Sequence, residues 1–235
     1  MASIKDLQGC AKHHLDHYTS SLSIRSFLTY DIQGDPRAFG PVDALAPTFL
    51  AARVKQIAVK NLFSDESNFG YLALRKNIDV LLHMAATTPP DLGDTDFLAS
   101  EPSEIWSQVQ ACFDLACRGK AKHIRAVMLS KMLHRKLPDL IPIIDSQVTA
   151  FYGVGSQNPF PFFEKLRTDI HENLPWLLEL RGQRTTPDGR LLSILRLADI
   201  VIWEHRVTKC QHPHGPSAVC GYPNDCRFCY PDARS

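Results

Sequence analysis

The chain has 235 residues, of which 44% are hydrophobic and 22% are charged, and its formal net charge is +1. This composition predicts a soluble globular protein with a real core and excludes global disorder. It also excludes a protein coated in positive charge, while leaving room for a local basic face.

The N-terminal residues contain no apolar run of signal-peptide length, and no later segment approaches the roughly 20 apolar residues that a bilayer-spanning helix needs. We therefore expect a cytoplasmic protein. In that compartment the seven cysteines are not expected to form a disulfide framework, so a cluster of them indicates metal ligands first.

The predicted elements of the first half are helices. Residues 1–40 are expected to form an arm with one or two short helices. Apolar residues recur at helical spacing over 42–61 and again over 71–85. Two further helices are predicted over 103–117 and 122–134, separated by a turn that contains Gly119.

A segment bounded by Pro138 and Pro142 then interrupts the helical pattern, because proline lacks an N–H and restricts the residue before it. Asp145 follows at a position typical of a helix N-cap. The simplest interpretation is that Asp145 only caps the helix that begins at Ser146.

The remaining predicted helices cover about 162–173, 175–180 and 191–203, and the last of these is apolar on most sides, so we expect it in the core. No segment alternates apolar and polar residues long enough to indicate a sheet. The predicted fold class is therefore all-α, with a helical domain over 1–207 and a segment rich in Cys, His, Pro and Gly over 208–235.

Positive charge is concentrated between Arg118 and Lys136, a stretch without an acidic residue. Such a face suits a phosphate backbone, although a solvated helix surface is an equal alternative. The predicted DNA-binding residues are Lys120, Lys122, His123, Arg125, Lys131, Arg135 and Lys136.

The order of elements over about 105–152, together with the sequence Ile-Ile-Asp-Ser-Gln-Val over 143–148, resembles the helix-hairpin-helix DNA glycosylase superfamily. The resemblance implies a hairpin that grips double-stranded DNA and places the catalytic aspartate of the family on Asp145. The Lys-Leu-Pro-Asp-Leu-Ile-Pro sequence over 136–142 also resembles anti-phage bacterial glycosylases, which implies excision of α-glucosyl-hydroxymethylcytosine.

Two features depart from the family. Its hairpin normally reads Gly, apolar, Gly, whereas the matching residues here are His123, Ile124 and Arg125. Bifunctional members carry a lysine nucleophile where this chain has Val127, and valine cannot form a Schiff base. The resemblance therefore implies a monofunctional enzyme in which water attacks and Asp145 stabilises the sugar cation. Lys122 or Lys131 could substitute, but helix geometry is expected to keep both away from Asp145.

A base must leave the duplex before its glycosidic bond can be attacked, so an aromatic pocket is expected near Asp145. Phe151 and Tyr152 are the nearest aromatic residues in the sequence and are the candidates for this pocket. The alternative is that both side chains simply fill the core.

The C-terminal segment contains Cys210, Cys220, Cys226 and Cys229, separated by nine, five and two residues. Four thiols this close together predict a structural metal site. Some members of the resembling family hold an iron–sulfur cluster with four cysteines, but at a different spacing, so zinc is favoured. The other cysteines are interpreted as buried thiols or bystanders.

The sequence therefore predicts a DNA N-glycosylase that leaves an abasic site. One alternative is a non-enzymatic DNA-binding protein that uses the basic helix and the metal-bound segment. Another is a helical scaffold that binds protein.

Overall fold

The computed structural model describes residues 2–19, 25–66, 68–87, 97 and 104–208. Within these ranges the chain is helical, and the one extended pairing is an isolated bridge between Thr185 and Leu191. The all-α prediction is therefore confirmed for the described part of the chain. No helix in these ranges is both long and apolar enough to cross a membrane.

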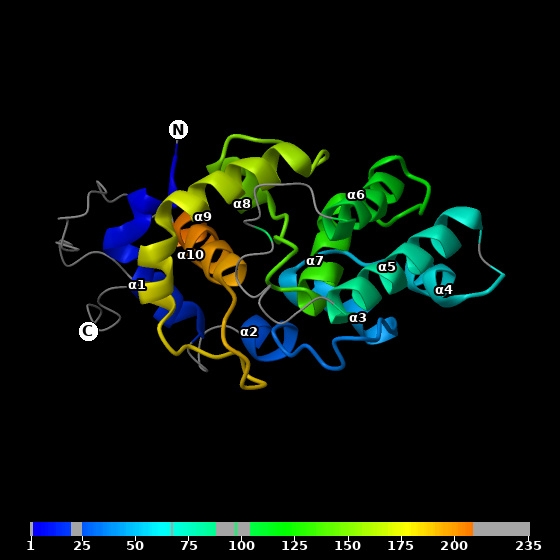
Figure 1. Cartoon of the computed structure of the whole chain (residues 1–235), viewed down its shortest axis with the longest axis horizontal. Coiled ribbons are helices and arrows are strands. Elements are labelled where there is room, and N and C mark those ends of the chain that lie inside the picture. The colour runs from blue at the N-terminus through cyan, green and yellow to red at the C-terminus, as the bar shows by residue number, and fades with distance from the viewer. Residues whose placement is uncertain (1, 20–24, 67, 88–96, 98–103, 209–235) are drawn as a thin grey trace, which may run out of the picture.

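The helices pack in two groups, which occupy the two sides of Figure 1. The first group comprises η1 (Ile4–Leu7), α1 (Gln8–Thr19), α8 (Ser146–Phe151), α9 (Phe160–Arg181) and α10 (Ile194–Thr208). The second comprises α2 (Arg25–Tyr30), α3 (Pro41–Leu45), η2 (Ala46–Leu50), α4 (Gln56–Phe63), α5 (Phe69–Thr87), α6 (Glu104–Cys117) and α7 (Ala126–Lys136).

One hydrophobic cluster runs through both groups, from Ile4 and Leu15 on one side to Leu74 and Phe113 on the other. The groups are therefore two lobes around a shared core. The segment between α7 and α8 crosses from the second lobe to the first and carries Asp145.

The single helix predicted over 42–61 is wrong, because α3, η2 and α4 replace it. Pro47 cannot donate a backbone hydrogen bond, and Ala51 ends η2 with a left-handed φ of 57°. The resulting bend turns residues 49–51 away from the helical path. This bend is important because Phe49, Leu50 and Ala51 all line the cavity described below.

Two helices were predicted where the structure has one, because α9 continues through Pro175. The proline removes one hydrogen bond from the helix. Buried side chains on both sides of it, including Phe163, Ile170 and Leu177, keep the two halves in one helix. Packing of the apolar face therefore overrides the local preference.

Helices α6 and α7 form a hairpin that α5 supports from one side. Gly119 has the left-handed φ of 67° expected of a residue that follows a helix end. Gly70 of α5 lies so close to the turn that an added Cβ would lie 1.9 Å from the carbonyl oxygen of Lys120. The hydroxyl of Tyr71 donates to the carbonyl of Lys122 beside it.

Gly70→Ala is therefore expected to destabilise the fold by about 1–3 kcal/mol, because a methyl group cannot share space with a backbone carbonyl. Alanine is otherwise a better helix former than glycine by about 1 kcal/mol. The substitution would therefore stabilise the fold if the added methyl group met no neighbour. Thermal unfolding measures the effect. Gly155→Ala is the control, because its Cβ would meet nothing within 4 Å; equal stability of the two variants would contradict the close approach.

Candidate functional site

Two neighbouring pairs of residues set the register between α7 and the segment that follows it. The Ser130 hydroxyl accepts a hydrogen bond from the backbone N–H of Ile144 at 3.0 Å. Lys131 follows Ser130, and Asp145 follows Ile144. These two residues form an ion pair at 3.1 Å. A short extended segment folded back on a helix therefore brings together two groups that lie 14 positions apart.

Asp145 is confirmed as the N-cap of α8. One carboxylate oxygen accepts a hydrogen bond from the backbone N–H of Gln147 at 2.9 Å, and the other faces the Nζ of Lys131. The Asp145 side chain is 19% exposed, whereas that of Lys131 is 3% exposed. Capping thus uses only one oxygen, and the second pairs with Lys131.

Lys131 was expected to lie away from Asp145, and this expectation is wrong. Its Nζ donates both to Asp145 and to the carbonyl of Leu50 at 3.0 Å. The expectation depended on helix register alone, whereas the extended segment before Asp145 returns along α7.

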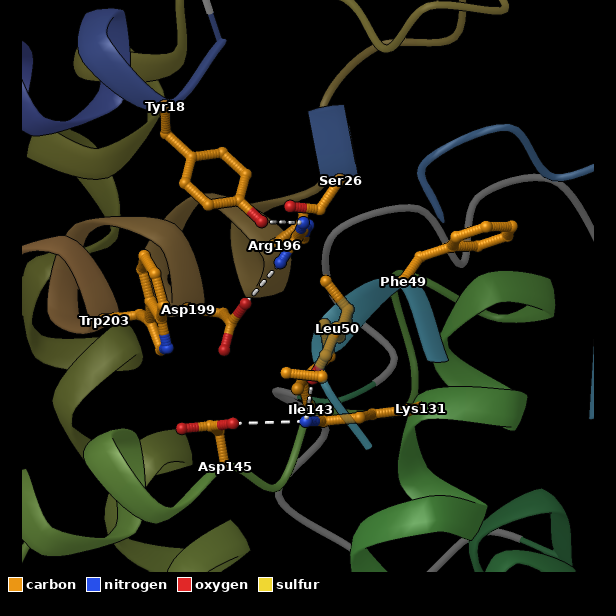
Figure 2. A pocket seen from close by; sticks show the side chains of 11 residues that line it. Tyr18, Ser26, Phe49, Leu50, Lys131, Ile143, Asp145, Arg196, Asp199 and Trp203 are labelled. Atoms are coloured by element: carbon orange, nitrogen blue, oxygen red, sulfur yellow. Dashed lines mark hydrogen bonds and ion pairs between the residues drawn. The ribbon is translucent and has the colours of Figure 1, made fainter. Parts of the chain in front are cut away.

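The ion pair lies in a cavity of about 260 Å³ between the two lobes. Figure 2 shows Asp145 and Lys131 on one side of it, with side chains of α1 and α10 opposite. Its walls are mixed in character, with aromatic, aliphatic and charged groups. The lining residues are Tyr18, Ser26, Phe49, Leu50, Ala51, Lys131, Ile143, Asp145, Arg196, Asp199 and Trp203.

Arg196 organises the wall opposite Asp145. Its guanidinium makes two hydrogen bonds of 2.8 Å to the carboxylate of Asp31, a third of 2.9 Å to the hydroxyl of Tyr18, and an ion pair with Asp199. The rings of Tyr18 and Tyr30 also lie over the guanidinium. This buried network holds Asp199 at the cavity.

Asp199 is the second carboxylate of the site. One of its oxygens contacts Arg196, while Oδ1 is buried and has no hydrogen-bond partner among the described residues. Figure 2 shows the free oxygen directed toward the side where Asp145 lies. Burial raises the pKa of Asp199 to about 6; the positive charge of Arg196 opposes this shift, and the negative charge of Asp145 adds to it.

Three of the predicted DNA-binding residues, Lys131, Arg135 and Lys136, are buried, so the prediction that they form an exposed face is corrected. Asp43 pairs with Arg135 and, at 3.0 Å, with Lys136. Charge on this side of α7 therefore neutralises buried carboxylates instead of facing solvent.

The remaining basic residues surround the turn between α6 and α7. Lys120, Lys122 and Arg125 are exposed, and His123 between them is half-buried. His123 has a left-handed φ of 74°, a conformation that favours glycine. Desolvation and then the nearby charges of Lys55, Lys122 and Arg125 lower the pKa of His123. The turn is thus a locally positive surface.

Phe151 and Tyr152, the predicted base-pocket residues, are not among the residues that line the Asp145 cavity. The hydroxyl of Tyr152 donates to the Asp169 carboxylate at 2.8 Å in the core of the first lobe. Phe151 packs edge-on against Tyr152 and His205. The aromatic side chains at the cavity are instead Tyr18, Phe49 and Trp203, which come from segments far from Asp145 in the sequence.

The predicted metal ligands Cys210, Cys220, Cys226 and Cys229 lie outside the described residues. The zinc site over 208–235 therefore stays a prediction.

The model of a family of unknown function (DUF6308) matches residues 11–206. Every residue that lines the cavity falls within this range. No curated protein and no solved structure gives a match.

Proposed function

The chain belongs to the DUF6308 family, whose function is unknown, and we propose that it is a monofunctional DNA glycosylase. It would hydrolyse the N-glycosidic bond of a modified base and leave an abasic site. The observation that carries the proposal is a pair of carboxylates, Asp145 and Asp199, at one aromatic-walled cavity.

Hydrolysis of a glycosidic bond needs negative charge beside the sugar cation that develops and a proton for the leaving group. Asp145 supplies the charge, since its carboxylate lies at the cavity, 3.1 Å from the Nζ of Lys131. Asp199 supplies the proton, because its buried free oxygen faces the same space and its pKa is about 6. Two chemically identical groups would thus take different roles, Asp145 as the stabilising charge and Asp199 as the acid.

The cavity suits one extruded base. Its volume of about 260 Å³ is slightly below the range of about 300–1,000 Å³ for small-ligand sites. Tyr18 and Trp203 supply aromatic side chains to its wall, and the guanidinium of Arg196 and the carboxylate of Asp199 supply polar groups for the base edge. The sequence resemblance adds glucosylated hydroxymethylcytosine as the substrate to test first.

The turn between α6 and α7 would hold the DNA. Its exposed cations, Lys120, Lys122 and Arg125, surround the N-terminus of α7, where backbone N–H groups can bind a phosphate. The left-handed conformation of His123 supports this role, because it reproduces without glycine the chain reversal that the hairpin requires.

A second candidate is a glycosylase that also cleaves the DNA strand through a lysine nucleophile. The 3.1 Å contact between Lys131 and Asp145 favours it. Against it, Nζ of Lys131 donates to two oxygen atoms and is therefore held as a hydrogen-bond donor to both.

Borohydride trapping distinguishes the two candidates. A monofunctional enzyme produces abasic sites that break only with alkali and gives no covalent protein–DNA adduct on reduction. An adduct that forms with the parent chain and disappears in Lys131→Met would establish the lysine mechanism. Absence of abasic sites in every modified DNA tested would overturn the proposed activity itself.

The acid role of Asp199 predicts a pH profile. Its carboxyl holds the proton below about pH 6, so kcat should fall about tenfold per pH unit well above that value. Asp199→Asn keeps the shape but cannot give up a proton, and it should lower kcat by about 10²–10⁴ and remove this slope. An unchanged pH profile in Asp199→Asn would refute the assignment.

A further inference from the structure

Three side chains with metal-binding atoms converge between α1 and α10, apart from the residues that line the Asp145 cavity. Cys10 and His14 come from α1, and His205 comes from α10. One ligand atom of each lies within 4.8 Å of the other two. The rings of His14 and His205 meet edge-on, with their centroids 6.0 Å apart.

The helix geometry fixes this arrangement. Residues four positions apart lie on the same face of a helix, so Cys10 and His14 project together toward α10, against which α1 packs. Cys10 is 4% exposed and His14 is 3% exposed, whereas His205 is half-buried. The cluster is therefore built into the helix–helix contact and opens on one side.

An independent observation indicates a ligand at this cluster. The Nε2 atom of His14 is buried and has no hydrogen-bond partner among the described residues. A buried imidazole nitrogen without a partner is unfavourable unless something else satisfies it.

We propose that Cys10, His14 and His205 bind one Zn²⁺ ion. One thiolate and two imidazoles form a ligand set that zinc accepts, and the tetrahedral ion would take a water molecule as its fourth ligand. The Cys10 thiol loses its proton to solvent as the Zn–S bond forms, while both imidazoles bind in the neutral form. The three ligand atoms lie within 4.8 Å of one another, and zinc–ligand bonds are about 2.0–2.3 Å long.

The ion would join α1 and α10, the first and last described α-helices. Tyr18 lies one further helical turn along the same face of α1, and Trp203 lies two residues before His205. Both line the Asp145 cavity. Zinc would therefore stabilise one wall of that cavity without entering it, whether or not the cavity is a glycosylase site.

Cobalt(II) binding tests the proposal, since Co²⁺ replaces Zn²⁺ and shows an ultraviolet charge-transfer band when a thiolate ligates it. The chain used has serine at Cys210, Cys220, Cys226 and Cys229, so that tail thiols cannot contribute. We expect one Co²⁺ per chain with this band. Cys10→Ser should abolish the band, and His14→Gln should weaken binding at least tenfold. Cys117→Ser and His83→Gln are the controls, because they alter a half-buried cysteine and an exposed histidine elsewhere. Neither should change the band or the affinity for Co²⁺.

Metal content of the natural chain gives a second measurement if the serine-substituted chain does not fold. After purification with zinc, Cys10→Ser and His14→Gln should each hold one equivalent less than the parent chain, and zinc should raise the parent's Tm. A folded chain with serine in the tail that binds no Co²⁺, a band that survives Cys10→Ser, or an unchanged zinc content in both variants would overturn the site.

Discussion

Asp145→Asn is expected to lower the rate of base release by about a thousandfold or more, because it removes the charge that stabilises the sugar cation. The asparagine oxygen can still accept the hydrogen bond from the Gln147 N–H that caps α8. DNA affinity should therefore be retained. Single-turnover release of base, measured beside binding of the same DNA, separates the two effects.

The control must account for Lys131, since Asp145→Asn leaves a buried cation without its anion. That loss can cost about 3–5 kcal/mol. The double variant Asp145→Asn with Lys131→Met removes both charges and should recover stability without recovering activity. The Asp65 side chain is 90% exposed, so Asp65→Asn should leave stability and activity unchanged. Activity near the parent level in a folded Asp145→Asn variant would return Asp145 to the role of a helix cap.

Arg196→Met is expected to destabilise the fold by about 3–5 kcal/mol, because Asp31 and Asp199 would lose their buried cation. For a chain of this size the loss corresponds to a fall in Tm of roughly 6–20 °C. The Arg196 side chain is 3% exposed, so water cannot replace the lost contacts. Thermal and urea unfolding measure the change.

Arg118→Met is the matched control, since Arg118 pairs with Asp114 on the surface of α6 at side-chain exposures of 71% and 50%. Exposed pairs one helical turn apart contribute about 0.3–0.5 kcal/mol. If Arg196→Met lowers the free energy of unfolding no more than Arg118→Met does, the Arg196 network does not stabilise the protein.

The sequence predicted much of the helical pattern, because apolar periodicity and end signals are local properties. The helix over 71–85, the end of α6 before Gly119 and the cap at Asp145 are all confirmed. Local rules failed where tertiary packing decided the outcome. Pro175 did not end α9, and the bend at Ala51 was not expected.

The candidate site was predicted only in part, because most of it comes from segments distant in the sequence. Asp145 is local to its motif, whereas Tyr18, Phe49 and Asp199 reach it through the fold. One signal was overlooked. Arg196 and Asp199 lie three positions apart within α10, most of whose residues are buried, and charged groups at such a position must be paired inside the core or serve a site.

The exposed face predicted between Arg118 and Lys136 was partly wrong for a related reason. Charge density along the sequence does not tell exposed cations from cations that neutralise buried carboxylates. Asp43 lies about ninety positions before Arg135, so nothing local revealed the pairing. Lys120, Lys122 and Arg125, at the exposed turn, are the residues on which the DNA-binding prediction now depends.

Release of free base from DNA is the most direct test of the account. The purified chain is incubated with unmodified DNA, with DNA containing hydroxymethylcytosine, and with DNA containing its α-glucosylated form, and the freed bases are identified by mass. We expect release from modified DNA, at a rate that Asp145→Asn abolishes. Intact binding without release from any of the three would contradict the glycosylase proposal and favour a DNA-binding protein without this activity.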